Sequence, residues 1–377
     1  MSSTATSNRA TTAATSRVSV KKLLVVFIAT LVVGATAVVT ANFWLDPMNY
    51  STTYHRKAAA AFEAGKGFAI YDPTIDYRGL RREHFRTMAK TPEVVLFSGS
   101  RFELVHAGMF PGYSFYNSFV QRDYWDDNMA IAEILETADR MPKNLLLSVR
   151  LFSFRPHDKR PEGDQWKMFV PEAASMASRL NTEPPSRLDN FPWAHWLSLF
   201  SIDKLSHQIK MRWNHGGQGI SVTDAKTLAD MEVLHADGSL SFSDKHRKSF
   251  TPDAARAGSA KKAAEDRNKP VTKPDPKQLA QMKALLERLV AKGVNVAIVI
   301  TPQHPAYWQG VAGSPYGQML VDLENEVRGI ATAAGAQFVG GFNPTVAGCP
   351  ETAYRDFIHV ENDCLQTIFS KIKLKKS

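Results

Sequence analysis

Two short motifs carry the residue types that nucleophilic catalysis needs. The apolar run VVLFSGS (94–100) ends in Ser-Gly-Ser, and a C-terminal segment holds Asp356 and His359 three residues apart. A serine at a sharp turn after a strand exposes its hydroxyl near backbone N–H groups that can stabilise an oxyanion. On one helical turn Asp356 and His359 share a face, so the histidine is placed to accept the proton of Ser100 while the aspartate orients it. The pattern predicts a Ser-His-Asp set.

Each motif taken alone has an ordinary structural explanation. Ser-Gly-Ser is common in turns, and Asp-x-x-His is frequent in surface pairs and helix caps. Together they are more specific, because Ser100 ends the first strand of the expected sheet while Asp356 and His359 follow the last strand. The carboxyl ends of parallel strands meet at one rim, where open α/β sheets bind their ligands.

An alternation of strands and helices must position these motifs. The expected strands are 94–100, 113–120, 144–152, 294–301 and 336–342, and the expected helices are 101–110, 126–140, 276–292 and 316–335. Strand, helix and strand in this order predict an α/β fold with parallel pairing and right-handed crossovers. The two parts of this domain are residues 93–152 and 276–377.

Two segments lie outside the alternation. Residues 42–92 are predicted as a mostly helical lead-in, with one helix that ends at Gly65 or Gly67. Residues 153–275 hold several prolines, an aromatic patch and a basic run rich in Ala and Lys. They predict a large insertion that is partly disordered, with a solvated and mobile last third. The basic run (259–277) is more typical of a solvated loop than of a ligand site.

The N-terminus contains one apolar segment of membrane length. Residues 23–41 carry no charge, and at about 1.5 Å per residue they span roughly 28 Å, close to the bilayer core. Residues 1–22 carry four basic and no acidic residues, which predicts a cytoplasmic tail and an outward-facing body. We favour an uncleaved single-pass anchor over a cleaved signal peptide, and both over a buried core helix. Either membrane interpretation exports the body.

Composition and charge exclude several classes of protein. With 44% hydrophobic and 22% charged residues, the chain can bury a sizeable core. The net charge of +9 is concentrated in the two tails and in residues 245–277, so no basic groove for nucleic acid is implied. The histidines show no HExxH spacing, the cysteines form no CxxC pair, and GxGxxG and Walker loops are absent. We therefore expect neither a metal nor an organic cofactor.

The two catalytic motifs resemble those of the SGNH (GDSL-type) hydrolase superfamily. Ser98-Gly99-Ser100 is similar to its first block and Asp356-Phe357-Ile358-His359 to its last, which implies a Ser100 nucleophile, a His359 base and an orienting Asp356. VVLFSGSR, FYNSFV and AIVITPQHP, after a single crossing and an Asp-Pro pair, look like membrane-anchored members of the alginate O-acetylation type. The resemblance implies a three-layer, flavodoxin-like parallel sheet.

The sequence departs from the family pattern at the expected oxyanion donors. The second block of the family contains a glycine, but in this sequence Asn117 is followed by Ser118 and Phe119. The Gly-x-Asn of the third block is absent as well. Candidate oxyanion or substrate-binding residues are therefore Asn117, Arg101, Arg150 and His304, all near the carboxyl ends of expected strands.

The resemblance implies an exported O-acyltransferase or esterase that acts on acyl groups, with acetyl the expected one, of an envelope or secreted polysaccharide. A membrane protein that supplies the acyl group is an implied partner, and the bacterial inner membrane with the C-terminal domain in the periplasm is the implied location. The alternative is a non-catalytic scaffold or glycan-binding component of a polysaccharide assembly complex that keeps the same fold.

The two cysteines predict a disulfide. Cys349 and Cys364 lie in the exported part, where oxidation is allowed, and their loop contains Asp356 and His359. We expect the bridge to hold His359 near Ser100. The alternative is a pair of buried, unpaired thiols.

Overall fold

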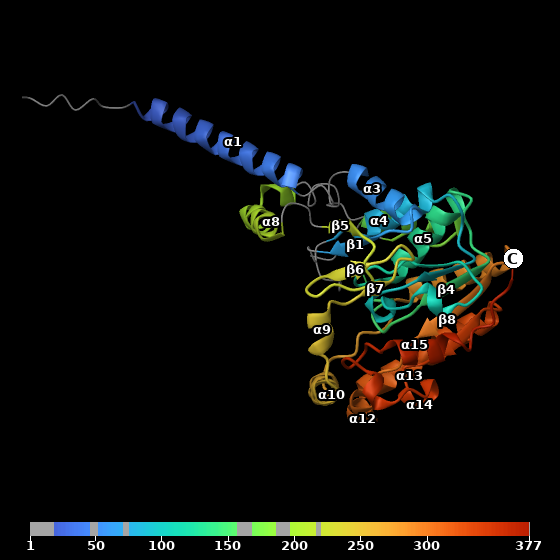
Figure 1. The fold of residues 1–377 in the computed structure, drawn as a ribbon. Helices are drawn as coiled ribbons and strands as arrows, with labels where there is room; N and C mark the ends of the chain where they lie inside the picture. Colours follow the sequence, from blue (N-terminus) through green and yellow to red (C-terminus); the bar gives the residue numbers. More distant parts are fainter. Residues whose placement is uncertain are drawn as a thin grey trace, which may run out of the picture.

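The computed structural model describes residues 19–45, 52–70, 75–156, 168–185, 197–215 and 220–376. The body of the protein is built on a five-stranded sheet. A long N-terminal helix projects from this body (Figure 1). In spatial order the strands are Phe115–Asn117 (β3), Val94–Phe97 (β2), Asn144–Ser148 (β4), Asn295–Ile300 (β8) and Gln337–Gly340 (β9). All neighbouring strands are parallel, so the predicted α/β class with a parallel sheet is confirmed.

Alternate residues of the central strands enter two separate apolar cores. In β2, Val95 and Phe97 pack into one core, whereas Val94 and Leu96 pack into the other. Successive side chains of a strand point to opposite faces, so a sheet covered on both faces needs apolar residues at every position. This explains why the central strands are continuous apolar runs.

Helices supply the other half of each core. The first core receives Trp125–Thr137 (α5), Val170–Arg179 (α6), Pro276–Ala291 (α11) and Pro315–Ala333 (α13). The second receives Thr52–Glu63 (α3) and Asn362–Phe369 (α15), and Tyr77–Thr87 (α4) contributes to both. Local signals fix where these helices begin: Asp275 caps α11 by accepting from the Lys277 N–H, and Pro276 follows at the first helical position.

A second, antiparallel sheet joins the lead-in to the insertion, and the sequence analysis did not predict it. Its order is Ile220–Thr223 (β5), Gly67–Ile70 (β1), Glu232–Leu234 (β6) and Leu240–Ser241 (β7). The β6–β7 turn contacts the end of β3, where the Asn117 N–H donates to the Asp237 carbonyl at 2.7 Å. Gly238 has φ +79°, and a Cβ there would lie 2.0 Å from the Asn117 oxygen, so this contact requires glycine.

Two local predictions are wrong. The helix expected at 101–110 is replaced by two short 3₁₀ turns, Ser100–Phe102 (η1) and Ala107–Met109 (η2). The segment expected to be solvated and mobile forms the helix Pro252–Asp266 (α10), which buries Ala263 against Pro305–Val311 (α12). The remaining short elements are Asp244–Lys248 (α9), Pro344–Ala347 (α14) and Glu351–Ala353 (η6).

The predicted apolar segment 23–41 lies within one long helix, Val20–Leu45 (α1). This helix is long and apolar enough to cross a membrane, and none of its most apolar stretch is buried by the rest of the chain. Ser198–Phe200 (η5) and Ile202–His215 (α8) lie beside its C-terminal part (Figure 1). The predictions for residues 1–18, for the Asp-Pro pair at 46–47 and for most of the aromatic patch fall outside the described residues.

Candidate active site

Ser100, His359 and Asp356 form a continuous chain of hydrogen bonds. The Ser100 Oγ lies 3.1 Å from His359 Nε2, and His359 Nδ1 lies 2.7 Å from Asp356 Oδ2. The first residue begins η1 directly after β2, and the other two follow β9. The fold therefore brings together a hydroxyl, an imidazole and a carboxylate within the distances that serine catalysis requires.

Asp356 is held as a carboxylate. Its Oδ1 accepts the N–H groups of Ile358 and His359, both at 2.8 Å. Burial alone would raise the pKa of Asp356, but the hydrogen bond from His359 and the two backbone bonds outweigh burial and lower that pKa to about 2. An ionised Asp356 accepts a hydrogen bond from the Nδ1–H group of His359, which leaves Nε2 to accept one from the Ser100 hydroxyl.

The loop that carries Asp356 and His359 is a bend rather than the expected helical turn. Tyr354 and Val360 form an isolated antiparallel bridge that closes it, and the Arg355 N–H donates to the His359 carbonyl at 2.9 Å. The backbone N–H groups of Ile358 and His359 donate to the Asp356 carboxylate instead of to backbone carbonyls. Such a side-chain bond favours a turn over a helix. The three-residue spacing still places both side chains together.

The predicted Cys349–Cys364 disulfide is present, so the expectation of a bridge is confirmed. It joins the segment before the bend to α15, which begins directly after the bend. Cys364 is fully buried in the second core. The bridge thus ties both ends of the loop that carries the base to the packed body.

The turn before Ser100 depends on a contact that the sequence analysis missed. A Cβ on Gly99 would lie 1.9 Å from Asp123 Oδ1, so the close approach of this carboxylate needs glycine. Asp123 is buried, and its Oδ1 accepts from Arg150 Nε at 2.6 Å. Asp123 belongs to no motif that the sequence alone would single out. It lies next to Gly99 only because the fold brings the two residues together.

Ser100 lines a cavity of about 470 Å³ that is strongly cationic. Six of its lining residues are Arg or Lys and one is acidic: Arg101, Arg150, Arg155, Lys262, Lys269, Lys273 and Asp266. Aromatic side chains from α12, α13 and neighbouring loops form much of the remaining wall. Such a cavity suits a ligand that combines negative charge with an apolar surface.

Arg101 is the most deeply buried of these cations. Burial, followed by repulsion from Arg150, lowers the pKa of Arg101 to about 10, which leaves the guanidinium charged at neutral pH. Gln303, oriented to satisfy both ends of its amide, accepts from Arg101 Nη1 at 3.3 Å and donates to the Phe357 carbonyl at 3.2 Å. Gln303 therefore links this cation to the loop that carries His359.

The other predicted site residues divide into two groups. Arg150 lines the cavity, paired with Asp123 and stacked over the Tyr124 ring. Asn117 is fully buried, and its amide donates to the carbonyls of two residues of the Ser100 turn, so it holds the turn instead of facing the cavity. His304 is also fully buried and caps α12, so its role here is structural.

Helix α10 supplies cavity residues that the sequence analysis assigned to a solvated loop. Asp266 accepts from Lys269 Nζ at 2.6 Å and from the Tyr307 hydroxyl at 2.9 Å, and it also pairs with Lys262. The buried residues Ser259, Ala263 and Asp266 recur at helical spacing. That periodicity was the available signal for an ordered helix.

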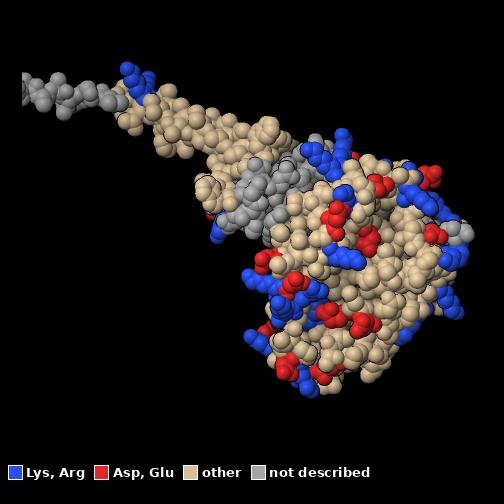
Figure 2. Space-filling view, in the orientation of Figure 1, with Lys and Arg blue, Asp and Glu red and all other residues tan. Residues whose placement is uncertain are grey.

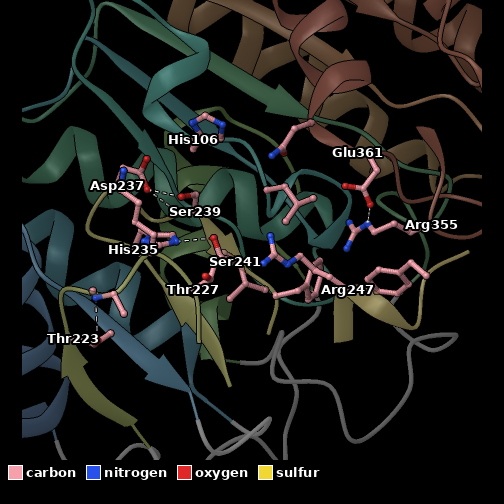
Figure 3. Close-up of a pocket in the computed structure, with 18 of the residues that line it drawn as sticks. His106, Thr223, Thr227, His235, Asp237, Ser239, Ser241, Arg247, Arg355 and Glu361 are labelled. Atoms are coloured by element: carbon pink, nitrogen blue, oxygen red, sulfur yellow. Dashed lines mark hydrogen bonds and ion pairs between the residues drawn. The ribbon is translucent and has the colours of Figure 1, made fainter. Parts of the chain in front are cut away.

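A second cavity, of about 850 Å³, lies between the antiparallel sheet and the segment around Arg355 (Figure 3). It contains another Ser–His pair, with Ser241 Oγ 2.8 Å from His235 Nε2. The nearby Asp237 carboxylate accepts instead from Ser239 and from a backbone N–H. Of these two Ser–His pairs, the one at Ser100 therefore continues to a carboxylate in the part of the chain that the structure describes.

No family model, curated protein or solved structure matches the chain. Among the described residues, no group of three or more His, Cys, Asp or Glu is arranged to hold a metal ion.

Proposed function

We propose that the protein is a membrane-anchored, serine-dependent O-acyltransferase or esterase that acts on acyl groups, with acetyl the expected one, of an exported polysaccharide. The observation that carries the proposal is the Ser100, His359 and Asp356 chain at the wall of a substrate-sized cavity. Serine at the end of a strand, with its base after the last strand, is the arrangement that α/β enzymes use for acyl transfer.

The proposed reaction proceeds through an acyl-enzyme. Ser100 Oγ attacks the ester carbonyl, and its proton passes to His359 Nε2. The leaving alcohol receives that proton as the ester bond breaks, and the acyl group remains on Ser100. A glycan hydroxyl or water then gives its proton to His359 Nε2 and attacks the acyl carbon. The bond from the acyl group to Ser100 Oγ breaks, and His359 returns the proton to Ser100 Oγ. The first N–H groups of η1 lack acceptors within that turn, which favours the Ser100 N–H as an oxyanion donor.

Two further features support the SGNH-like interpretation and an exported location. The strand order of the main sheet, counted along the chain as second, first, third, fourth and fifth, is the order of flavodoxin-like sheets. The apolar helix α1 and the disulfide suit a single-pass protein of the bacterial inner membrane with its body in the periplasm. A membrane acyl-donor protein would then act on the same side as Ser100.

The charge of the cavity favours an acidic glycan as substrate. Cations from three separate segments, represented by Arg101, Arg150 and Lys262, converge on the space beside Ser100. Carboxylates on sugar rings would neutralise this charge, and the aromatic wall would contact the rings themselves.

The test is ester turnover by the full-length protein in detergent. We expect wild type to release p-nitrophenol from p-nitrophenyl acetate and Ser100→Ala to show no turnover above background. Ser98→Ala is the matched control: it removes the bond from Ser98 to Asn117 in the same turn and leaves the catalytic chain intact. It should cost about 1 kcal/mol of stability and retain most of the activity. Equal turnover by Ser100→Ala and wild type would contradict the proposal.

The acidic-substrate part has its own test. Lys273 is exposed at the rim of the cavity, so Lys273→Glu should raise KM for an acetylated oligouronide and leave KM for neutral p-nitrophenyl acetate unchanged. An equal effect on both esters would remove the charge argument without affecting the serine mechanism.

One observation favours the second candidate, a non-catalytic scaffold or glycan-binding component. Both amide hydrogens of Asn117 are used within the turn, so this side chain supplies no oxyanion donor. Binding of an acidic oligosaccharide by a wild-type protein that turns over no ester would support this candidate.

A further inference from the structure

We propose that the segment from Leu197 to His215, comprising η5 and α8, is an interfacial membrane helix that lies on the bilayer surface beside α1. The occupant of this surface is the lipid of the same membrane that α1 enters. The proposal is independent of the chemistry at Ser100.

Five large apolar side chains of this segment are more than half exposed in the part of the chain that the structure describes. The exposed fractions are 64% for Leu197, 55% for Phe200, 71% for Ile202, 51% for Ile209 and 88% for Trp213. Apolar side chains clustered at this density on a soluble surface mark an interaction site. Tryptophan in such a cluster is typical of the boundary between headgroups and acyl chains.

Within α8, the spacing places the exposed apolar residues Ile202, Ile209 and Trp213 on one side of the helix. Leu205, Ile209 and Trp213 are four residues apart, so they form one stripe along the helix. Ile202 lies on the same side, and together they line a shallow apolar groove of about 450 Å³. An apolar stripe on an otherwise polar helix is the pattern of helices that lie in a membrane interface.

Asn42 fixes this stripe to the end of α1. Its fully buried side-chain amide donates to the carbonyls of Leu199 and Ser201, at 2.6 and 2.9 Å. Asn42 lies three residues before α1 ends at Leu45, and its neighbour Trp44 is 71% exposed. The attachment point is therefore at the depth where a crossing helix leaves the hydrocarbon.

Helix α8 and the η5 turn contact the C-terminal part of α1 directly. Figure 2 shows uncharged atoms along α1 beyond the basic atoms at its N-terminal end, and most of the charged atoms of this view lie on the body. The α8 sequence contains three Lys or Arg and one Asp, which complements anionic headgroups. This direct contact with α1 selects lipid over a second protein as the occupant. A second attachment beside α1 would restrict how the body can tilt above the membrane.

The experiment places an environment-sensitive fluorophore on the full-length protein in vesicles of phosphatidylcholine and phosphatidylglycerol. Both native cysteines are in the disulfide, so Ile209→Cys supplies one labelling site on the stripe. Asp203→Cys, an exposed position turned about 120° from Ile209 around the same helix, is the matched control. Thermal unfolding and retention of the disulfide establish that both labelled variants are folded.

We expect brominated acyl chains to quench the probe at 209 several-fold more than the probe at 203, and aqueous iodide to show the reverse. Equal quenching by iodide at both positions would overturn the proposal, because the stripe would then face water. Protection of position 209 from both quenchers would also overturn it, because a protein surface would then cover the stripe.

Discussion

At the scale of single residues, the proposed mechanism depends on the bond between Asp356 and His359, which holds the imidazole with Nε2 toward Ser100. With Asp356→Asn the amide no longer fixes the histidine tautomer, so we expect kcat to fall by roughly 10²–10⁴-fold with little change in KM. The measurement is ester hydrolysis by the purified full-length variant. A raised KM with an unchanged kcat would show that Asp356 binds substrate instead.

The same carboxylate predicts a stability effect at low pH. Its pKa is about 2 in the folded protein and near 3.8 when unfolded, so ionised Asp356 stabilises the fold above about pH 4. This contribution is lost as the pH falls toward 2. The difference in melting temperature between wild type and Asp356→Asn should therefore shrink over that range. A constant difference would contradict the assigned pKa.

Glu103 predicts the opposite pH dependence. It is buried beside Arg355, and burial raises the pKa of Glu103 to about 8 although the arginine opposes this. The folded protein then holds a proton that the unfolded chain loses near pH 4.5, so the free energy of unfolding falls as pH rises from about 5 to 8. In thermal unfolding, the stability of Glu103→Gln should not show this part of the decline with rising pH. Melting temperatures of wild type and Glu103→Gln that fall in parallel as pH rises would contradict the raised pKa of Glu103.

At the scale of elements, the disulfide and the bend form one unit. Cys349→Ser should cost about 3 kcal/mol of stability, the value for closing a loop of this length. Because the bridge ties both ends of the segment with His359, we also expect kcat to fall more than KM rises. Thermal unfolding and ester kinetics measure the two effects. Full activity in a destabilised variant would refute the positioning role.

The strands and the serine motif could be predicted because their signals are local. β2 is apolar throughout and β8 is apolar after its first residue, Asn295, as strands covered on both faces must be. The Ser-Gly-Ser turn and the Asp-x-x-His spacing place their side chains correctly even though the second is a bend.

The rest of the site could not be read from local patterns. Asp123 and Gln303 reach the Ser100 turn and the His359 loop only through the fold. The antiparallel sheet pairs the four residues of β1 with strands some 150 residues later, and segments so short carry no periodicity. The basic composition of α10 obscured the helical spacing of its buried residues.

At the scale of the whole molecule, the proposed anchor α1 would determine on which side of the membrane Ser100 lies. The basic flank before α1 predicts that the C-terminus faces outward. An alkaline phosphatase reporter fused after Ser377 should be active in a bacterial host, and the full-length mass should remain in membranes. An inactive reporter would contradict the orientation, and a shorter soluble form would show that α1 is cleaved.

The central claim is that the fold makes Ser100 a nucleophile. The most direct measurement is labelling of the full-length protein by a serine-directed fluorophosphonate, with mass spectrometry of the labelled peptide. Ser100 should carry the adduct in wild type and lose it in His359→Ala, while Ser241, the serine of the second Ser–His pair, should remain unlabelled. An unlabelled Ser100, or labelling that persists in His359→Ala, would contradict the claim.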